Sequence, residues 1–361
     1  MFWYAALVGR LPACRTRVYF PPSSSLVNIQ MNQPTIDVVG IGNAIVDVLA
    51  HADEAFLEQE GLVKGTIALI DADRAAALYH IMGPAIEASG GSVGNTMAGI
   101  ASLGGNCAFI GKVRDDLLGE VYRHDMTAQG VRFETPPATS GPATARCLFL
   151  VTSDGQRTGN TYLGACVGLG PDDIDPDLVG AAQVTYLEGY LFDPPLAQQA
   201  FRKAAAIAHA AGRKVALSLS DPFCVERHRA AFRDLVAGHV DILFANEIEI
   251  CSLYETRDFA TAAAAVRGQV AIAALTRSAQ GSVILTNGEA YQIAAAPVAR
   301  VVDSTGAGDL YAAGFLYGLT RGLPLPICGE IGSLCAAEII SHFGARPERS
   351  LSELVAAAKG L

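Results

Sequence analysis

The chain has 361 residues, of which 51% are hydrophobic and only 17% charged, so it can bury a large core and is not a largely disordered protein. Its net charge of −10 argues against nucleic acid or an anionic membrane surface as a partner, and no stretch approaches the roughly 20 apolar residues of a membrane span. The eight cysteines are scattered without a C-x-x-C pair, which is typical of buried thiols in a reducing cytosol, so we expect a cytoplasmic protein.

The first 34 residues differ from the rest of the chain. They contain no Asp or Glu, and Pro-Pro-Ser-Ser-Ser interrupts them at 21–25. We expect residues 1–34 to be a poorly ordered extension that is dispensable for folding, with a transit peptide as the alternative. Residues 35–361 then form one folded domain.

From residue 36 onward, apolar strand-like runs alternate with helical segments. The run at 36–42 ends in glycines and predicts a buried parallel strand. The further predicted strands are 106–113, 183–189, 214–221, 241–247 and 269–276, and the predicted helices are 92–105, 115–130, 194–212, 226–238 and much of the chain after about 324. This alternation predicts an α/β fold with a doubly wound, mostly parallel sheet and helices on both faces.

Two segments break the alternation, at about 44–72 and 133–168. Both contain short β-like pieces without full crossover helices. We therefore predict a small β-sheet that projects over the active site as a lid.

Two common nucleotide-binding signatures are absent. The stretch from Gly40 begins like G-x-G-x-x-G, but Ile45 occupies the third glycine position, which disfavours a dehydrogenase. The P-loop is also missing, because Val113 follows the only Gly-Lys pair. A bound nucleotide would need another phosphate site.

The sequence DSTGAGD at 303–309 can supply that site. Successive backbone amides from Thr305 to Asp309 can form an anion-binding nest at a helix N-terminus. Gly306, Ala307 and Gly308 carry little or no side chain that would obstruct a phosphate. Asp309 would lie beside the phosphate and accept a proton from an attacking hydroxyl. A capped structural turn is the alternative.

Two segments carry a resemblance to a known family. DSTGAGD resembles the second signature of the ribokinase-like (PfkB) carbohydrate kinases, and residues 90–119 resemble the first, although Arg114 stands where many members have glycine. The resemblance covers roughly residues 35–347. It implies an ATP-dependent kinase in which residues 306–308 form the anion hole and Asp309 is the catalytic base.

The resemblance also implies cation sites. Asn246 and Glu249, in the sequence NEIE, would organise Mg²⁺ and phosphate through water, with a helix capping box as the alternative. Family members often bind K⁺ near the anion hole, where Asp303 would be a neighbour.

A nucleotide loop is implied at residues 276–282. Thr276 and Gly281 match the family's T-x-G-x-x-G pattern, and Ser278 replaces its first glycine. We expect this loop to contact ATP.

The acceptor side of the site is predicted from polar residues that follow the first strand and the first glycine pair. These are Asn43, Asp47, Gly91 and Asn95. A carboxylate surrounded by amides suits the vicinal hydroxyls of a sugar. The N-x-x-x-D spacing and the sequence GGSVGN resemble the adenosine-kinase branch, with Asn95 on the ribose. We therefore expect phosphorylation of the 5′-hydroxyl of adenosine to give AMP, by a monomer or homodimer.

Alternatives remain open at this point. A sugar or sugar-phosphate kinase would use the same catalytic residues, and Arg146 and Arg157 could hold a second phosphate. A nucleoside-binding protein without activity is disfavoured by Asp309, because a protein that only binds has no use for a base there.

Overall fold

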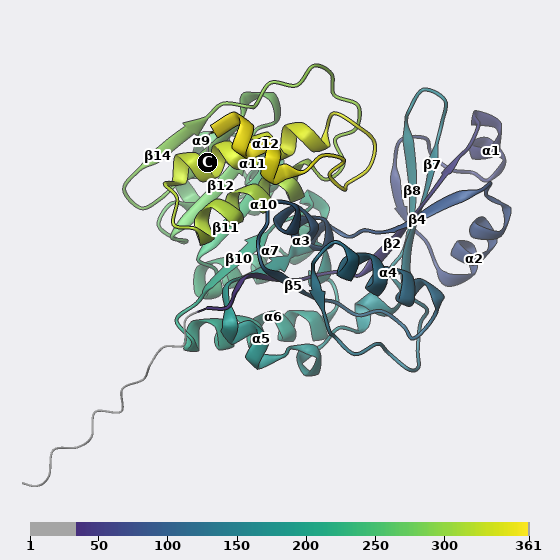
Figure 1. Cartoon of the computed structure of the whole chain (residues 1–361), viewed down its shortest axis with the longest axis horizontal. Helices are drawn as coiled ribbons and strands as arrows, with labels where there is room; N and C mark the ends of the chain where they lie inside the picture. Colours follow the sequence, from purple (N-terminus) through teal and green to yellow (C-terminus); the bar gives the residue numbers. More distant parts are fainter. Residues whose placement is uncertain (1–33, 360–361) are drawn as a thin grey trace, which may run out of the picture. The chain divides into compact units, whose positions relative to one another are not determined.

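The structure is a computed structural model that describes residues 34–359. The predicted extension, residues 1–34, therefore lies outside the described residues except for Pro34. The described chain contains a nine-stranded and a five-stranded β-sheet (Figure 1). Within this range, no helix is both long enough and apolar enough to cross a membrane.

The nine-stranded sheet is mostly parallel. Its strands follow the order β14-β13-β12-β11-β10-β9-β1-β5-β6, and only the pairs β12–β13 and β13–β14, at one edge, are antiparallel. The strands are β1 (Ile36–Ile41), β5 (Cys107–Ile110), β6 (Arg132–Phe133), β9 (Ala182–Glu188), β10 (Lys214–Ser218), β11 (Ile242–Asn246), β12 (Ile272–Thr276), β13 (Ser282–Leu285) and β14 (Ala290–Ile293). The central strands are almost fully buried, as their continuous apolar runs indicate.

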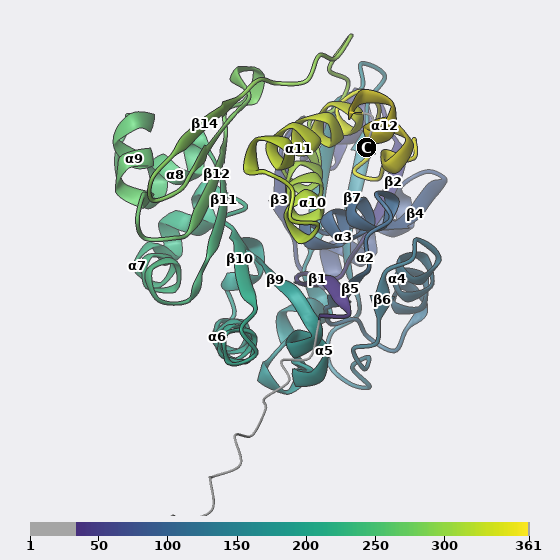
Figure 2. The same cartoon turned by 60° about the vertical axis from the view of Figure 1, so that its left-hand side comes forward.

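Helices cover both faces of this sheet, which confirms the predicted doubly wound fold (Figure 2). One apolar core lies beneath α5 (Pro176–Ala181), α6 (Pro195–Ala210), α7 (Pro222–His239), α8 (Glu247–Leu253) and α9 (Phe259–Val266). The other lies beneath α3 (Ser92–Ser102), α4 (Leu117–Ala128), α10 (Ala307–Thr320), α11 (Leu325–Ile339) and α12 (Leu351–Lys359).

The five-stranded sheet, which we call the lid sheet, is built from two separate parts of the chain. Its order is β3 (Ile67–Leu69), β8 (Arg157–Tyr162), β7 (Ala145–Val151), β2 (Ile45–His51) and β4 (Ala85–Ser89). Strand β4 extends the sheet beyond the predicted segment 44–72. Buried side chains of α1 (Glu54–Gln59) and α2 (Ala72–Ile81) pack on one face of the sheet. Its action as a lid stays a prediction.

Glycines allow α3, α10 and α11 to pack closely. A Cβ atom at Gly99 would lie 2.6 Å from Leu310 Cδ1, and one at Gly314 would lie 2.8 Å from the Cα atom of Gly332. A side chain at either position would force the helices apart. This contact sets the positions of the N-termini of α3 and α10.

Candidate active site

The candidate site lies at the point in the nine-stranded sheet where the strand order reverses. Strand β1 pairs with β5 on one side and β9 on the other, and ligands of such sheets bind at the carboxyl ends of the strands near this reversal. Asn43 follows β1, Glu188 ends β9, and Asn246 and Thr276 end β11 and β12. The predicted polar residues thus share one edge of the sheet.

Asp309, the candidate base, is held by two donors from α3. Ser92 Oγ donates to Asp309 Oδ1 at 2.6 Å, and Asn95 Nδ2 donates to Oδ2 at 3.0 Å. Burial raises the pKa of Asp309 to about 6, although these hydrogen bonds and the charge of Arg346 act to lower it. The carboxylate is therefore oriented and has a pKa suited to accepting a proton near neutral pH.

Free amides lie at the start of α10, next to this carboxylate. The N–H groups of Gly306, Gly308 and Asp309 have no hydrogen-bond partner among residues 34–359. Gly306 has a φ of +80°, a conformation that favours glycine, whereas Gly308 is helical and a Cβ atom there would meet nothing within 4 Å. The turn therefore offers amide donors and open space for an anion.

The predicted nest from Thr305 to Asp309 is too large. The Thr305 amide donates to Asp303 Oδ1 at 3.0 Å, and the Ala307 amide donates to the Ser304 carbonyl at 3.2 Å. Both bonds stabilise the turn itself. Sequence spacing alone does not distinguish amides that close a turn from those that stay free.

Asp47, on β2, lies against the first glycine turn. A Cβ atom at Gly90 would be 2.4 Å from Asp47 Oδ2. The Asp47 carboxylate receives no hydrogen bond from any described residue. Burial raises its pKa to about 7, Arg346 and Arg157 act to lower the pKa, and the negative charge of Asp309 raises it further. An acceptor group without a donor thus lies within electrostatic range of the candidate base.

Asn43 and Gly91 meet beside Asp47. A Cβ atom at Gly91 would lie 2.2 Å from the Asn43 carbonyl oxygen, and the φ of Gly91 is +81°. Asn43 Nδ2 donates to Glu188 Oε1 at 2.7 Å, and the Val93 amide donates to Glu188 Oε2 at 3.0 Å. Burial raises the pKa of Glu188 to about 7. Glu188 was not predicted from the sequence, although its position at the end of β9 was a signal.

Asn95 makes a contact that was not predicted from the sequence. Its side-chain nitrogen contacts the candidate base, whereas the sequence predicted contact with a ribose. Its Oδ1 atom is buried and has no hydrogen-bond partner among the described residues. That oxygen can still accept a hydroxyl of a bound acceptor.

Asn246 and Glu249 form a capping box at the start of α8. The Glu249 amide donates to Asn246 Oδ1 at 2.9 Å, and both Glu249 oxygens accept from Asn246. Burial raises the pKa of Glu249 to about 7. In residues 34–359, no cluster of three or more His, Cys, Asp or Glu side chains could hold a metal ion. These residues fit only an Mg²⁺ that is bound mainly by phosphates and water.

The predicted nucleotide loop follows β12. Ser278, which replaces the family's glycine, has a φ of +49°, and Gly281 has a φ of +81°. The left-handed conformation of Ser278 explains why glycine suits this position. Thr276 ends β12 at the same edge of the sheet as Asn246.

Two arginines near the site were not assigned these partners from the sequence. Arg346, in the loop before α12, donates to the carbonyls of Ser89 and Gly94, and its charge lowers the pKa of both Asp47 and Asp309. Arg157, at the start of β8, forms an ion pair with Asp303. Local spacing gave no signal for either contact, because each joins distant parts of the chain.

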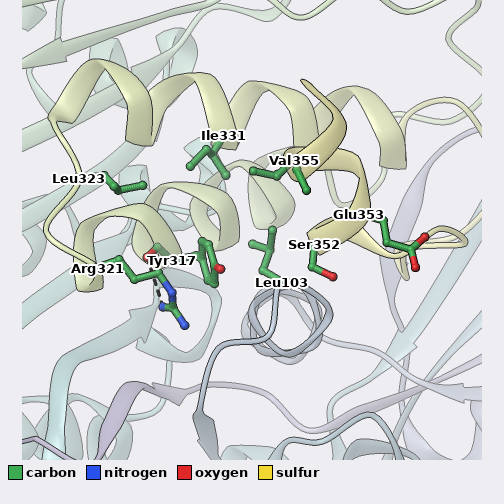
Figure 3. Close-up of a pocket in the computed structure, with 9 residues that line it drawn as sticks. Leu103, Tyr317, Arg321, Leu323, Ile331, Ser352, Glu353 and Val355 are labelled. Carbon is green, nitrogen blue, oxygen red and sulfur yellow. Dashed lines mark hydrogen bonds between the residues drawn. The ribbon is translucent and has the colours of Figure 1, made fainter. Parts of the chain in front are cut away.

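A cavity of about 460 Å³ lies elsewhere, at the C-terminal ends of α3 and α10 (Figure 3). Leu103, Tyr317, Leu323, Ile331 and Val355 provide its apolar lining. Tyr317 is eight residues beyond Asp309 along α10, which corresponds to about 12 Å of helix. This cavity is therefore separate from the candidate site.

Comparisons with known proteins show which chains this one is similar to. The chain is 53% identical to the adenosine kinase from Sinorhizobium meliloti, whose structure matches 90% of this chain and 99% of that chain with a TM-score of 0.83. It is 50% identical to a probable sugar kinase from Rhizobium etli CFN 42, over 91% of this chain and 100% of that one, with a TM-score of 0.85. It is also 25% identical to the adenosine kinase of Saccharomyces cerevisiae, over 86% of this chain and 96% of the relative.

The family model for pfkB family carbohydrate kinases matches residues 85–351. This range contains both glycine-rich turns and the candidate base. The protein is accordingly a phosphotransferase that acts on a hydroxyl group. The chain belongs to the pfkB family of carbohydrate kinases.

Proposed function

We propose that this kinase transfers the γ-phosphate of ATP to the 5′-hydroxyl of adenosine. The main support for this proposal is that the Asp47 carboxylate lacks a hydrogen-bond donor and lies beside Gly90. A carboxylate can accept two hydroxyl hydrogens at once, so vicinal ribose hydroxyls would satisfy Asp47. The unpartnered Oδ1 atom of Asn95 offers a further acceptor.

A shallow cavity supports a nucleoside over a simple sugar. Asp47, Cys147 and Thr161 are register partners across β2, β7 and β8, so they share one face of the lid sheet. Thr161, Leu69, Tyr162 and Leu163 are among the residues that line a cavity of about 240 Å³. Two strand spacings separate Asp47 from Thr161, about 10 Å. A nucleoside with its ribose at Asp47 could extend its base toward this apolar cavity.

The arrangement of arginines disfavours a sugar phosphate as acceptor. Arg146 is the register partner of Val46 and therefore lies on the lid-sheet face opposite Asp47, where its guanidinium stacks on the Tyr79 ring at 5.4 Å. Arg157 is engaged by Asp303. Arg146 lies on the wrong face and Arg157 is already paired, so neither supports binding of a second phosphate on an acceptor held at Asp47.

The proposed reaction uses groups already in place. Asp309 takes the proton as the acceptor oxygen attacks the γ-phosphorus and ADP leaves. The free amides of Gly306, Gly308 and Asp309 donate to the phosphoryl oxygens on which negative charge develops, and the α10 dipole favours the same charge. Mg²⁺ bound to the phosphates, with Glu249 and Asn246 acting through water, would neutralise further charge. We infer a cytoplasmic enzyme, monomeric or homodimeric.

The test compares acceptors with one enzyme preparation. Release of ADP is followed for adenosine, 2′-deoxyadenosine, ribose and fructose 6-phosphate, and Asp309→Asn measures the background. We expect adenosine to give the highest kcat/KM and 2′-deoxyadenosine a lower value, because the deoxy substrate leaves a buried acceptor unpaired. If either sugar wins by a wide margin, the adenosine assignment fails and the kinase assignment stands.

A further inference from the structure

A buried ion pair joins the lid sheet to the turn that carries the free amides. Arg157 Nη1 lies 3.1 Å from Asp303 Oδ2, and each side chain is only 10% exposed. The Arg157 guanidinium also lies over the rings of Phe149 and Phe343, at 5.3 and 5.9 Å from the ring centroids. The position of this positive charge is therefore fixed by the carboxylate and by two aromatic rings.

The Asp303 carboxylate is surrounded by three hydrogen-bond donors and one positive charge. Its Oδ1 atom accepts from the Thr305 amide at 3.0 Å and from Thr305 Oγ1 at 2.7 Å. Its Oδ2 atom accepts from the Gly344 amide at 3.3 Å and contacts Arg157. An ionised carboxylate has about four lone-pair sites; three hydrogen bonds occupy this one, and the Arg157 guanidinium forms an ion pair with it. A metal ion bound to Asp303 would have to share this buried carboxylate with the positive charge of Arg157.

Asp303, which the family resemblance implied as a neighbour of K⁺, therefore has a protein cation beside it already. The need for a compensating charge remains, because a buried, uncompensated carboxylate beside the anion hole would be costly and would repel an entering phosphate. We infer that the Arg157 guanidinium takes the place of a monovalent cation beside the anion hole, so that this kinase does not require K⁺. The inference holds whichever acceptor the enzyme uses.

The placement of Arg157 adds a consequence that a diffusible ion would not have. Arg157 belongs to β8 of the lid sheet, whereas Asp303 and Thr305 belong to the turn before α10. The compensating charge is present only while the lid sheet lies against the turn. The conformation of the turn that forms the anion hole therefore depends on the position of the lid sheet.

The first measurement compares rates in KCl and in choline chloride at equal ionic strength, with adenosine or whichever acceptor proves active. The parent enzyme should differ by less than about twofold. Arg157→Gln should lose at least about tenfold in kcat/KM, roughly 1.4 kcal/mol, and K⁺ or methylguanidinium should restore part of the loss. Arg146→Gln is the matched control, since Arg146 lies on the opposite face of the same sheet, and should behave like the parent.

The second measurement needs no substrate. The melting temperature of Arg157→Gln should be higher in KCl than in choline chloride, and those of the parent and Arg146→Gln should not differ between the salts. Should Arg157→Gln fail to fold, Arg157→Lys keeps the charge and should remain independent of K⁺. A parent rate that drops more than about fivefold without K⁺ would overturn the inference. So would a loss in Arg157→Gln that neither cation reverses.

Discussion

The two carboxylates of the candidate site differ in how fully the protein satisfies them. Asp309 accepts hydrogen bonds from Ser92 and Asn95, whereas the Asp47 side chain accepts none from the described residues. The phosphate side is thus organised before any acceptor binds, and the acceptor side is completed only by the ligand. Phosphate transfer is the same for many acceptors and needs a base in a fixed position. Selection among acceptors instead needs a group whose hydrogen bonds are completed only by the correct ligand.

Replacement of the base, Asp309, should have the largest effect on catalysis. Asp309→Asn keeps the shape of the side chain but cannot take a proton, so kcat should fall by roughly 10²–10⁴-fold. The dissociation constant of ATP, measured by calorimetry, should change little. If turnover stays within a few-fold of the parent, Asp309 is not the base.

Removal of Asp47 should act on acceptor binding instead. Each hydrogen bond to a charged group contributes roughly 1.5–3 kcal/mol, so Asp47→Ala, which removes up to two of them, should raise the acceptor KM by at least about tenfold. The KM for ATP should remain near the parent value, because the phosphate apparatus lies on the later turn. Equal losses for both substrates would show that Asp47 supports the whole site rather than the acceptor.

Loss of a single donor to the base should have the smallest effect. The hydrogen bond from Ser92 favours the ionised form of Asp309 and so lowers a pKa that burial has raised to about 6. Ser92→Ala should raise this pKa and move the acid limb of the kcat/KM profile to higher pH, with less than about tenfold loss at pH 8. Titration of Asp47 also contributes to this acid limb, because the two carboxylates interact electrostatically.

Asp47→Asn separates the two contributions to that limb, since it removes one titrating group and leaves Asp309. An acid limb that stays in place in Ser92→Ala, or moves to lower pH, contradicts the assigned role of Ser92.

Local patterns were sufficient to predict the fold and the helix N-terminus that carries Asp309. Apolar runs and glycine turns located β1, α3 and α10, because strands and helix ends depend on neighbouring residues in the chain. The NEIE pattern likewise forms the capping box that was the alternative interpretation. The glycine-rich turn placed Asp309 correctly at a helix N-terminus, although it did not reveal which amides stay free.

Contacts between distant segments could not be predicted in this way. The ion-pair partner of Asp303 comes from β8, the donors to Asp309 come from α3, and Arg346 contacts Ser89 across 257 residues of the chain. Their pairing depends on the packing of the sheets and helices, which no local spacing encodes. Strand β4 was missed for a related reason, because its exposed residues and its place at a sheet edge weaken the apolar pattern.

The lid sheet is built from two separate parts of the chain, and this affects the order in which the protein folds. The central pair of this sheet, β2 and β7, joins Ile45 to Ala145 across about 100 residues that include α3, β5 and α4. Closing so long a loop carries an entropic cost that falls once the intervening elements have condensed. The lid sheet should therefore be among the last parts to gain hydrogen-exchange protection during refolding, well after the central strands that precede the phosphate turn.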